Sequence, residues 1–125
     1  MTVALPVTAA RRRVLVVDDE RYNRELLERT LARHADVVLV DGVAAALAAL
    51  AAGPFDVILT DQRLVDGTGV ELATRARALA PAARIVIVTG WSDDPAVHAA
   101  RAAGTIDDVL TKPFAPIVLR ERVLG

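Results

Sequence analysis

The sequence contains no cysteine, and this absence removes several kinds of chemistry. A chain without thiols forms no disulfide, has no thiolate nucleophile and binds no metal through sulfur. It also fits a reducing compartment. The longest apolar run, residues 43–52, is well below the roughly 18 residues of a membrane span, and the opening MTVALPVTAA lacks the basic start of a signal peptide. We therefore expect a cytoplasmic protein that makes no membrane contact.

Aromatic residues and net charge are also low. Aromatic side chains make up 3% of the 125 residues, and the formal net charge is -1. This balance does not indicate a broad basic surface, so we expect no direct binding of nucleic acid. Lysine is rarer still, because 14 of the 15 basic residues are arginine and the only lysine is Lys112. A compact ammonium ion differs from a planar guanidinium, so position 112 is a candidate for a specific role.

The residues that are present predict one domain with alternating strands and helices. A hydrophobic content of 54% is enough to bury a single core. Five short apolar runs, largely β-branched and not alternating, are typical of strands buried on both faces: 14–17, 37–40, 57–59, 85–88 and 109–110. Helix-length stretches follow them: 22–34, 43–52, 70–79, 95–103 and 115–124. Repeated strand–helix units predict a doubly wound, mainly parallel sheet with helices on both faces.

Polar residues follow four of the predicted strands. Asp18 and Asp19 follow the first, Asp61 the third, Thr89 the fourth and Lys112 the fifth. The carboxyl ends of parallel strands share one edge of the sheet, where such folds bind ligands. If strands one and three are neighbours, about 4.8 Å apart, three carboxylates meet there and must either be partly protonated or hold a cation. Oxygen ligands without histidine or cysteine favour Mg²⁺.

Four motifs that contain these residues resemble one known family, the response-regulator receiver domains of bacterial two-component signalling. The resemblance extends from Arg13 onward and is carried, in the expected order, by VLVVDDE, LTDQRLVDGTGVEL, IVIVTG and LTKPF. Each motif alone is weak, but the four together are highly specific. The resemblance implies a flavodoxin-like sheet with strand order 2-1-3-4-5 and five helices. It divides the chain into a tail, residues 1–12, and a receiver domain, residues 13–125.

The resemblance also implies a phosphorylation site with magnesium. Asp61 would be the phosphoacceptor, and it would bind Mg²⁺ directly together with Asp19 and the backbone carbonyl of Arg63. Asp18 would act through a bound water. Such a domain takes its phosphoryl group from a histidine kinase or a phosphotransfer protein and then binds its output partner differently. It would be a signalling module that catalyses only its own phosphoryl transfer and dephosphorylation, rather than an enzyme with a separate substrate.

Two further residues would contact the transferred group. By the same resemblance Thr89 would hydrogen-bond the phosphoryl group and Lys112 would pair with it, beside a cis bond to Pro113. These roles agree with the chemistry, because an ammonium ion and a divalent cation neutralise charge on a phosphoryl group.

The sequence departs from the family pattern at four places. Val65 stands where proline is usual, which affects the stiffness of the loop after Asp61. Gly90 replaces alanine, and residues 104–108 contain one residue more than the commonest pattern. Val109 takes the place of the aromatic switch residue on the fifth strand, so the standard activation mechanism does not carry over directly.

Trp91 is a candidate replacement for that aromatic residue. It lies two residues after Thr89, and Arg63 lies two residues after Asp61, so we predict that the indole and the guanidinium stack across the mouth of the pocket. Partner binding, including a possible homodimer, is expected on the fourth helix, fifth strand and fifth helix. The fifth helix contains more apolar residues than one buried stripe needs: Ile117, Val118, Leu119, Val123 and Leu124.

Three other functions stay open. A haloacid-dehalogenase-like phosphatase also has an aspartate nucleophile after a strand, but it requires a second aspartate two residues on, where this sequence has Arg63. A flavodoxin-type cofactor binder would need hydroxyl and backbone donors in the first turn, which is acidic here. A pseudo-receiver that is never phosphorylated would keep the fold and act only as an interaction module.

Overall fold

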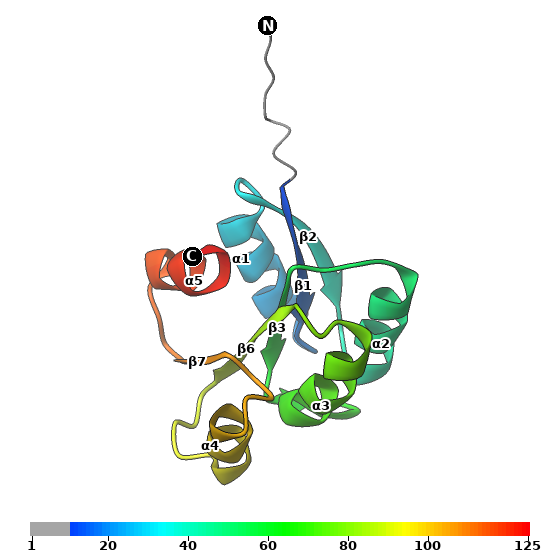
Figure 1. Ribbon diagram of the computed structural model, residues 1–125. Helices are drawn as coiled ribbons and strands as arrows, with labels where there is room; N and C mark the ends of the chain where they lie inside the picture. Colours follow the sequence, from blue (N-terminus) through cyan, green and yellow to red (C-terminus); the bar gives the residue numbers. More distant parts are fainter. Residues whose placement is uncertain (1–10) are drawn as a thin grey trace, which may run out of the picture.

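The structure, a computed structural model, describes residues 11–125 (Figure 1), so most of the predicted tail lies outside the described residues. The main sheet contains β1 (Arg12–Val17), β2 (Ala35–Val40), β3 (Val57–Asp61), β6 (Arg84–Thr89) and β7 (Asp108–Thr111). A small hairpin contains β4 (Arg63–Leu64) and β5 (Gly67–Thr68). The helices are α1 (Arg21–Leu31), α2 (Val43–Ala52), α3 (Gly69–Leu79), α4 (Pro95–Ala102) and α5 (Pro116–Leu124). None of these helices is long and apolar enough to cross a membrane.

The five strands of the main sheet are all parallel and lie in the order β2-β1-β3-β6-β7. Counting only the strands of this sheet, this is the predicted order 2-1-3-4-5, which is thereby confirmed. β1 and β3 are direct neighbours, with Val17 opposite Thr60. The residues that follow these two positions, Asp18 and Asp61, therefore reach the same edge of the sheet.

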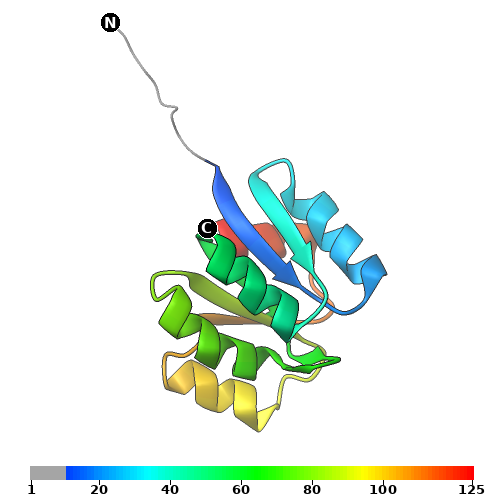
Figure 2. The ribbon, with the colours of Figure 1, turned by 90° about the vertical axis from the view of Figure 1, so that its right-hand side faces the viewer.

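Helices cover both faces of the sheet, as Figures 1 and 2 show. On one face, α2, α3 and α4 pack over strand residues such as Leu15, Ile58 and Ile87. On the other face, α1 and α5 pack over alternate residues such as Val16 and Leu59. Successive strand side chains point to opposite faces, so a sheet covered on both sides needs apolar residues at every position. This requirement explains the unbroken β-branched runs of the sequence.

Some strands and helices begin or end at other residues than predicted, and local contacts fix these ends. β1 begins at Arg12, one residue inside the segment that we predicted to be a tail. α1 ends at Leu31, before the predicted end at His34, because the His34 amide turns back to the Leu31 carbonyl. α3 begins with a capping box in which Thr68 and Glu71 bond each other's backbone N–H groups. The β4–β5 hairpin was not predicted.

Candidate functional site

Three carboxylates meet at the carboxyl edge of the sheet. Asp18 and Asp19 follow β1, and Asp61 is the last residue of β3. One carboxylate oxygen from each lies within 4.8 Å of the others. Asp18 is buried, and the other two are half-buried. The convergence that the sequence predicted from strand order is therefore present in the structure.

Asp18 is held in place by its own turn and by α1. Its carboxylate accepts the backbone N–H of Glu20 at 2.9 Å, and its carbonyl accepts the Arg24 guanidinium at 2.7 Å. Its amide donates to the Val40 carbonyl of β2 at 3.2 Å. Arg24 was not predicted as part of the site, because an arginine in a helix gives no sequence signal that it binds a backbone carbonyl of the site.

Burial is the main electrostatic effect at this cluster. It raises the pKa of the Asp18 carboxyl above its ordinary value of 3.8, and the negative charges of Asp61 and Asp19 act in the same direction. The bond from the Glu20 amide and the positive charge of Lys112 oppose that rise only in part. A cation at the cluster would favour the ionised carboxylate, so the raised pKa of Asp18 is consistent with a metal site.

We expect Asp18→Asn to stabilise the metal-free protein at neutral pH. Because the folded-state pKa of Asp18 is raised, its favourable contribution to stability is complete below the unfolded value and is lost as the pH rises through the folded pKa. Asparagine has the same shape, carries no charge and can still accept the Glu20 amide. Thermal unfolding in EDTA should give a midpoint a few degrees above that of the parent at pH 7, and a smaller difference near pH 4. A variant less stable than the parent at pH 7 would contradict this reading.

Lys112 and Thr89 lie at the same edge of the sheet as the three carboxylates. The Lys112 Nζ lies 3.3 Å from Asp61 Oδ2, and the Lys112 amide donates to the Thr89 carbonyl at 2.8 Å. The bond between Lys112 and Pro113 is cis, as predicted. The Thr89 hydroxyl accepts the Trp91 amide at 3.1 Å and lies 3.3 Å from the Trp91 carbonyl, to which it can donate. Thr89 therefore connects the pocket to the loop that leads into α4.

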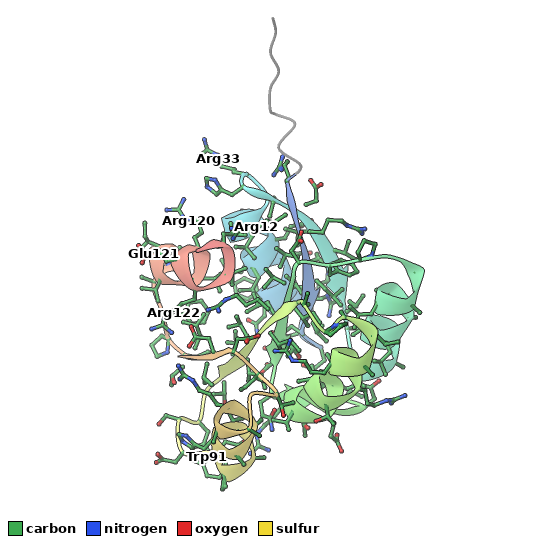
Figure 3. The ribbon with its side chains drawn as sticks, in the orientation of Figure 1. Arg12, Arg33, Trp91, Arg120, Glu121 and Arg122 are labelled. Carbon is green, nitrogen blue, oxygen red and sulfur yellow. The ribbon has the colours of Figure 1, made fainter. Side chains whose placement is uncertain are left out.

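The predicted stack of Arg63 and Trp91 is wrong. Within residues 11–125, the guanidinium that stacks on an aromatic ring belongs to Arg13 and lies 4.6 Å from the centre of the Phe55 ring. Arg63 is part of β4, where it pairs with Thr68. Trp91 is half-exposed at the surface beside α4 (Figure 3). The predicted stack across the mouth of the pocket is therefore not formed.

The loop after Asp61 is fixed by two side chains that sequence reasoning missed. The Gln62 side-chain carbonyl accepts the Val70 amide at 3.0 Å, at the start of α3. The Asp66 carboxylate accepts the Val43 and Ala44 amides at 2.7 and 3.0 Å, at the start of α2. The Asp66 contacts span 22 and 23 positions and the Gln62 contact spans 8, and no local sequence pattern indicated them.

The donor set fits a hard divalent cation. Three carboxylates supply oxygen ligands close together. The Lys112 ammonium beside them could pair with an anion that also binds the metal ion. Mg²⁺ prefers such oxygen ligands and retains waters that a phosphoryl oxygen can replace. Asp19 and Asp61 would hold it directly, and the Asp18 carboxylate lies beside them.

Comparison with solved structures places this fold in the CheY-like class. A response regulator receiver domain protein from Methanospirillum hungatei is similar with a TM-score of 0.84 and 27% identity, over 90% of each chain. A receiver domain of DrrB, solved in a BeF3-activated form, gives a TM-score of 0.81 and 27% identity over 90% of this chain and 94% of that one. The profile of the family "Response regulator receiver domain" matches residues 14–124, and the chain belongs to this family.

A curated relative agrees with this assignment. The response regulator protein PilR of Pseudomonas aeruginosa is 40% identical over 116 residues, which cover 91% of this chain and 26% of that protein. The chain thus spans about a quarter of the length of this relative. The shared part is the receiver domain, so the comparison concerns the receiver and not the rest of the regulator.

Proposed function

We propose that this domain accepts a phosphoryl group on Asp61 from a histidine kinase or a phosphotransfer protein. The observation that carries the proposal is that the Asp61 carboxylate lies 3.3 Å from an ammonium ion and has an oxygen within 4.8 Å of one from each of two further carboxylates. One carboxylate oxygen of Asp61 can act as the nucleophile. The Lys112 ammonium, and a metal ion held by the carboxylates, would offset the negative charge of the phosphoryl group. Phosphorylation would then change which partner the domain binds, in the cytoplasm.

The transfer itself needs little from the protein beyond position and charge. A carboxylate oxygen of Asp61 attacks phosphorus, the bond from phosphorus to the donor imidazole breaks, and an acyl phosphate forms. Bound Mg²⁺, held by Asp19, Asp61 and the Arg63 carbonyl, would supply positive charge to the phosphoryl oxygens. Lys112 pairs with a second oxygen, and the Thr89 hydroxyl hydrogen-bonds a third after leaving the Trp91 backbone.

Incubation with acetyl phosphate and Mg²⁺ tests the proposal. Intact mass should show one phosphoryl adduct that requires Mg²⁺ and disappears in EDTA. Absence of any adduct would favour the pseudo-receiver. Continuous turnover of a phosphate ester would favour the phosphatase, although Arg63 occupies the position where that class needs its second aspartate.

Trp91 should report phosphorylation. Because the Thr89 hydroxyl is bonded to the Trp91 backbone, Thr89 can turn to a phosphoryl group only if these bonds break and residue 91 is released. Trp91 is the chain's only tryptophan and is half-exposed, so a change in its surroundings should alter its fluorescence. We expect the emission to change when beryllofluoride, a phosphoryl mimic, is added with Mg²⁺.

Thr89→Val provides the control for this measurement. Valine keeps the shape but has no hydroxyl to transfer, so the emission should change less when beryllofluoride binds. The Trp91 reporter is refuted if the parent emission stays constant while calorimetry shows that beryllofluoride is bound.

The output partner is proposed to bind the face formed by α4, β7 and α5. The carboxylate of Asp108, buried at the start of β7, lies 3.1 to 3.4 Å from the guanidinium groups of Arg84, Arg101 and Arg122, which connect β6, α4 and α5. On α5, Ile117 is exposed, whereas Leu119 and Val123 belong to the core. Either an output partner or a second copy of the chain would bind this α4–β7–α5 face.

A further inference from the structure

The loop that follows Asp61 is a hairpin without the usual proline. Arg63 pairs with Thr68 and Leu64 with Gly67, so Val65 and Asp66 form the turn. Val65 is highly exposed and makes no core contact that would fix the turn. Proline stiffens a loop by fixing φ, and valine does not. The hairpin must be positioned by other contacts.

One such contact runs from the tip of the hairpin to α2. Asp66 Oδ1 lies 2.7 Å from the Val43 amide and Oδ2 lies 3.0 Å from the Ala44 amide. Both bonds favour the ionised carboxylate and lower its pKa. The two amides belong to the first turn of α2, whose N-cap residue, Gly42, has no side chain to cap it. One carboxylate thus serves two purposes, because it caps α2 and ties the hairpin to it.

Gly42 leaves the space that this contact requires. A Cβ at position 42 would lie 2.6 Å from Asp66 Oδ1, so any side chain there would displace the Asp66 carboxylate from its present position. The φ of Gly42 is −173°, an extended conformation open to every residue. The glycine is therefore explained by the approach of Asp66 and not by backbone strain.

The other end of the loop is held independently. The Gln62 carbonyl accepts the Gly69 amide at 2.9 Å, and its side chain accepts the Val70 amide. The segment between these points, which contains Arg63, is therefore fixed to α3 at its base and to α2 at its tip. Loss of the Asp66 contact would leave the hairpin, including Arg63, held at its base alone.

We propose that Asp66 is a positioning residue for the metal site. By tying the hairpin to α2 it holds the backbone carbonyl of Arg63 in place for a cation bound by Asp19 and Asp61, and it supplies the stiffness that proline would otherwise give. This inference rests on the proposed magnesium site.

The experiment separates positioning from simple capping of α2. Asp66→Ala removes both contacts and should lower the unfolding midpoint and weaken Mg²⁺ binding by about tenfold, the size of effect that outer-shell contacts produce. Adding Gly42→Ser to this variant gives α2 a serine cap of its own, because the Asp66 atoms that would clash are gone. The double variant should regain thermal stability while its Mg²⁺ affinity, measured by calorimetry, stays low.

Asp41→Ala is the matched control, since it removes an exposed carboxylate beside Gly42 and should leave Mg²⁺ affinity unchanged. Amide hydrogen exchange in EDTA gives a readout without metal: residues 63–68 should exchange faster in both Asp66 variants than in the parent. If Mg²⁺ affinity recovers together with stability in the double variant, Asp66 is only a helix cap and the inference is overturned. Unchanged exchange would also overturn it. A parent that binds no Mg²⁺ would instead refute the proposed function.

Discussion

Asp61→Asn is expected to abolish the phosphoryl adduct completely while leaving the fold intact. The amide of asparagine is not a nucleophile toward phosphorus, so no acyl phosphate can form. The substitution keeps the volume of the side chain, creates no cavity and removes repulsion with the two neighbouring carboxylates. Intact mass after incubation with acetyl phosphate and Mg²⁺ measures the adduct, and circular dichroism checks the fold.

Asp93→Asn is a suitable control for this experiment. Asp93 is exposed in the loop before α4 and should be phosphorylated no more than any surface carboxylate. The control should therefore accept the same single phosphoryl group as the parent. An undiminished adduct in Asp61→Asn, located by peptide mapping on another residue, would show that the acceptor has been misassigned.

Asp19→Asn is expected to weaken Mg²⁺ binding at least about tenfold more than Asp18→Asn does. The reason is that Asp19 would contact the ion directly, whereas Asp18 would act through a bound water. The Asp18 carboxylate is buried and already accepts the Glu20 amide, which suits a residue that acts through a bound water. The Asp19 side chain is half-buried, and within residues 11–125 it has no hydrogen-bond partner. It is therefore the freer of the two to contact the ion.

Calorimetric titration of the two variants and the parent with Mg²⁺ decides the point. The two substitutions remove the same charge from adjacent residues, so each serves as the control for the other. Equal losses of affinity would mean that both carboxylates bind the ion in the same way and that the assignment of the direct ligand is wrong.

Most of the fold could be predicted from patterns local to each strand, and the convergence of acids followed once the strand order was added. The unbroken apolar run from Val14 to Val17 indicates burial on both faces, as in a parallel sheet covered by helices. Once strand order was taken from the family, Asp18, Asp19 and Asp61 had to meet. The cis bond before Pro113 came from the same resemblance.

The parts that could not be predicted depend on contacts between loops. The Asp66 carboxylate reaches α2 across 23 positions of sequence, and Arg24 reaches the Asp18 carbonyl from a helix face that looked merely solvent-exposed. The expected stack of Arg63 on Trp91 failed for the same reason, because equal spacing after two strands does not fix where two loop side chains point. Tertiary geometry decides such pairs.

Because lysine is so rare in this sequence, the Lys112 amine beside Asp61 can be labelled selectively. Lys112 carries the only side-chain amine of these 125 residues, is partly open to solvent and lies 3.3 Å from Asp61. An amine-selective acylating reagent therefore modifies one side chain, and that side chain stands beside the acceptor. Any ligand that fills the pocket shields this amine, so the extent of acylation read by mass spectrometry becomes a footprint of site occupancy that needs neither an isotope nor an engineered probe.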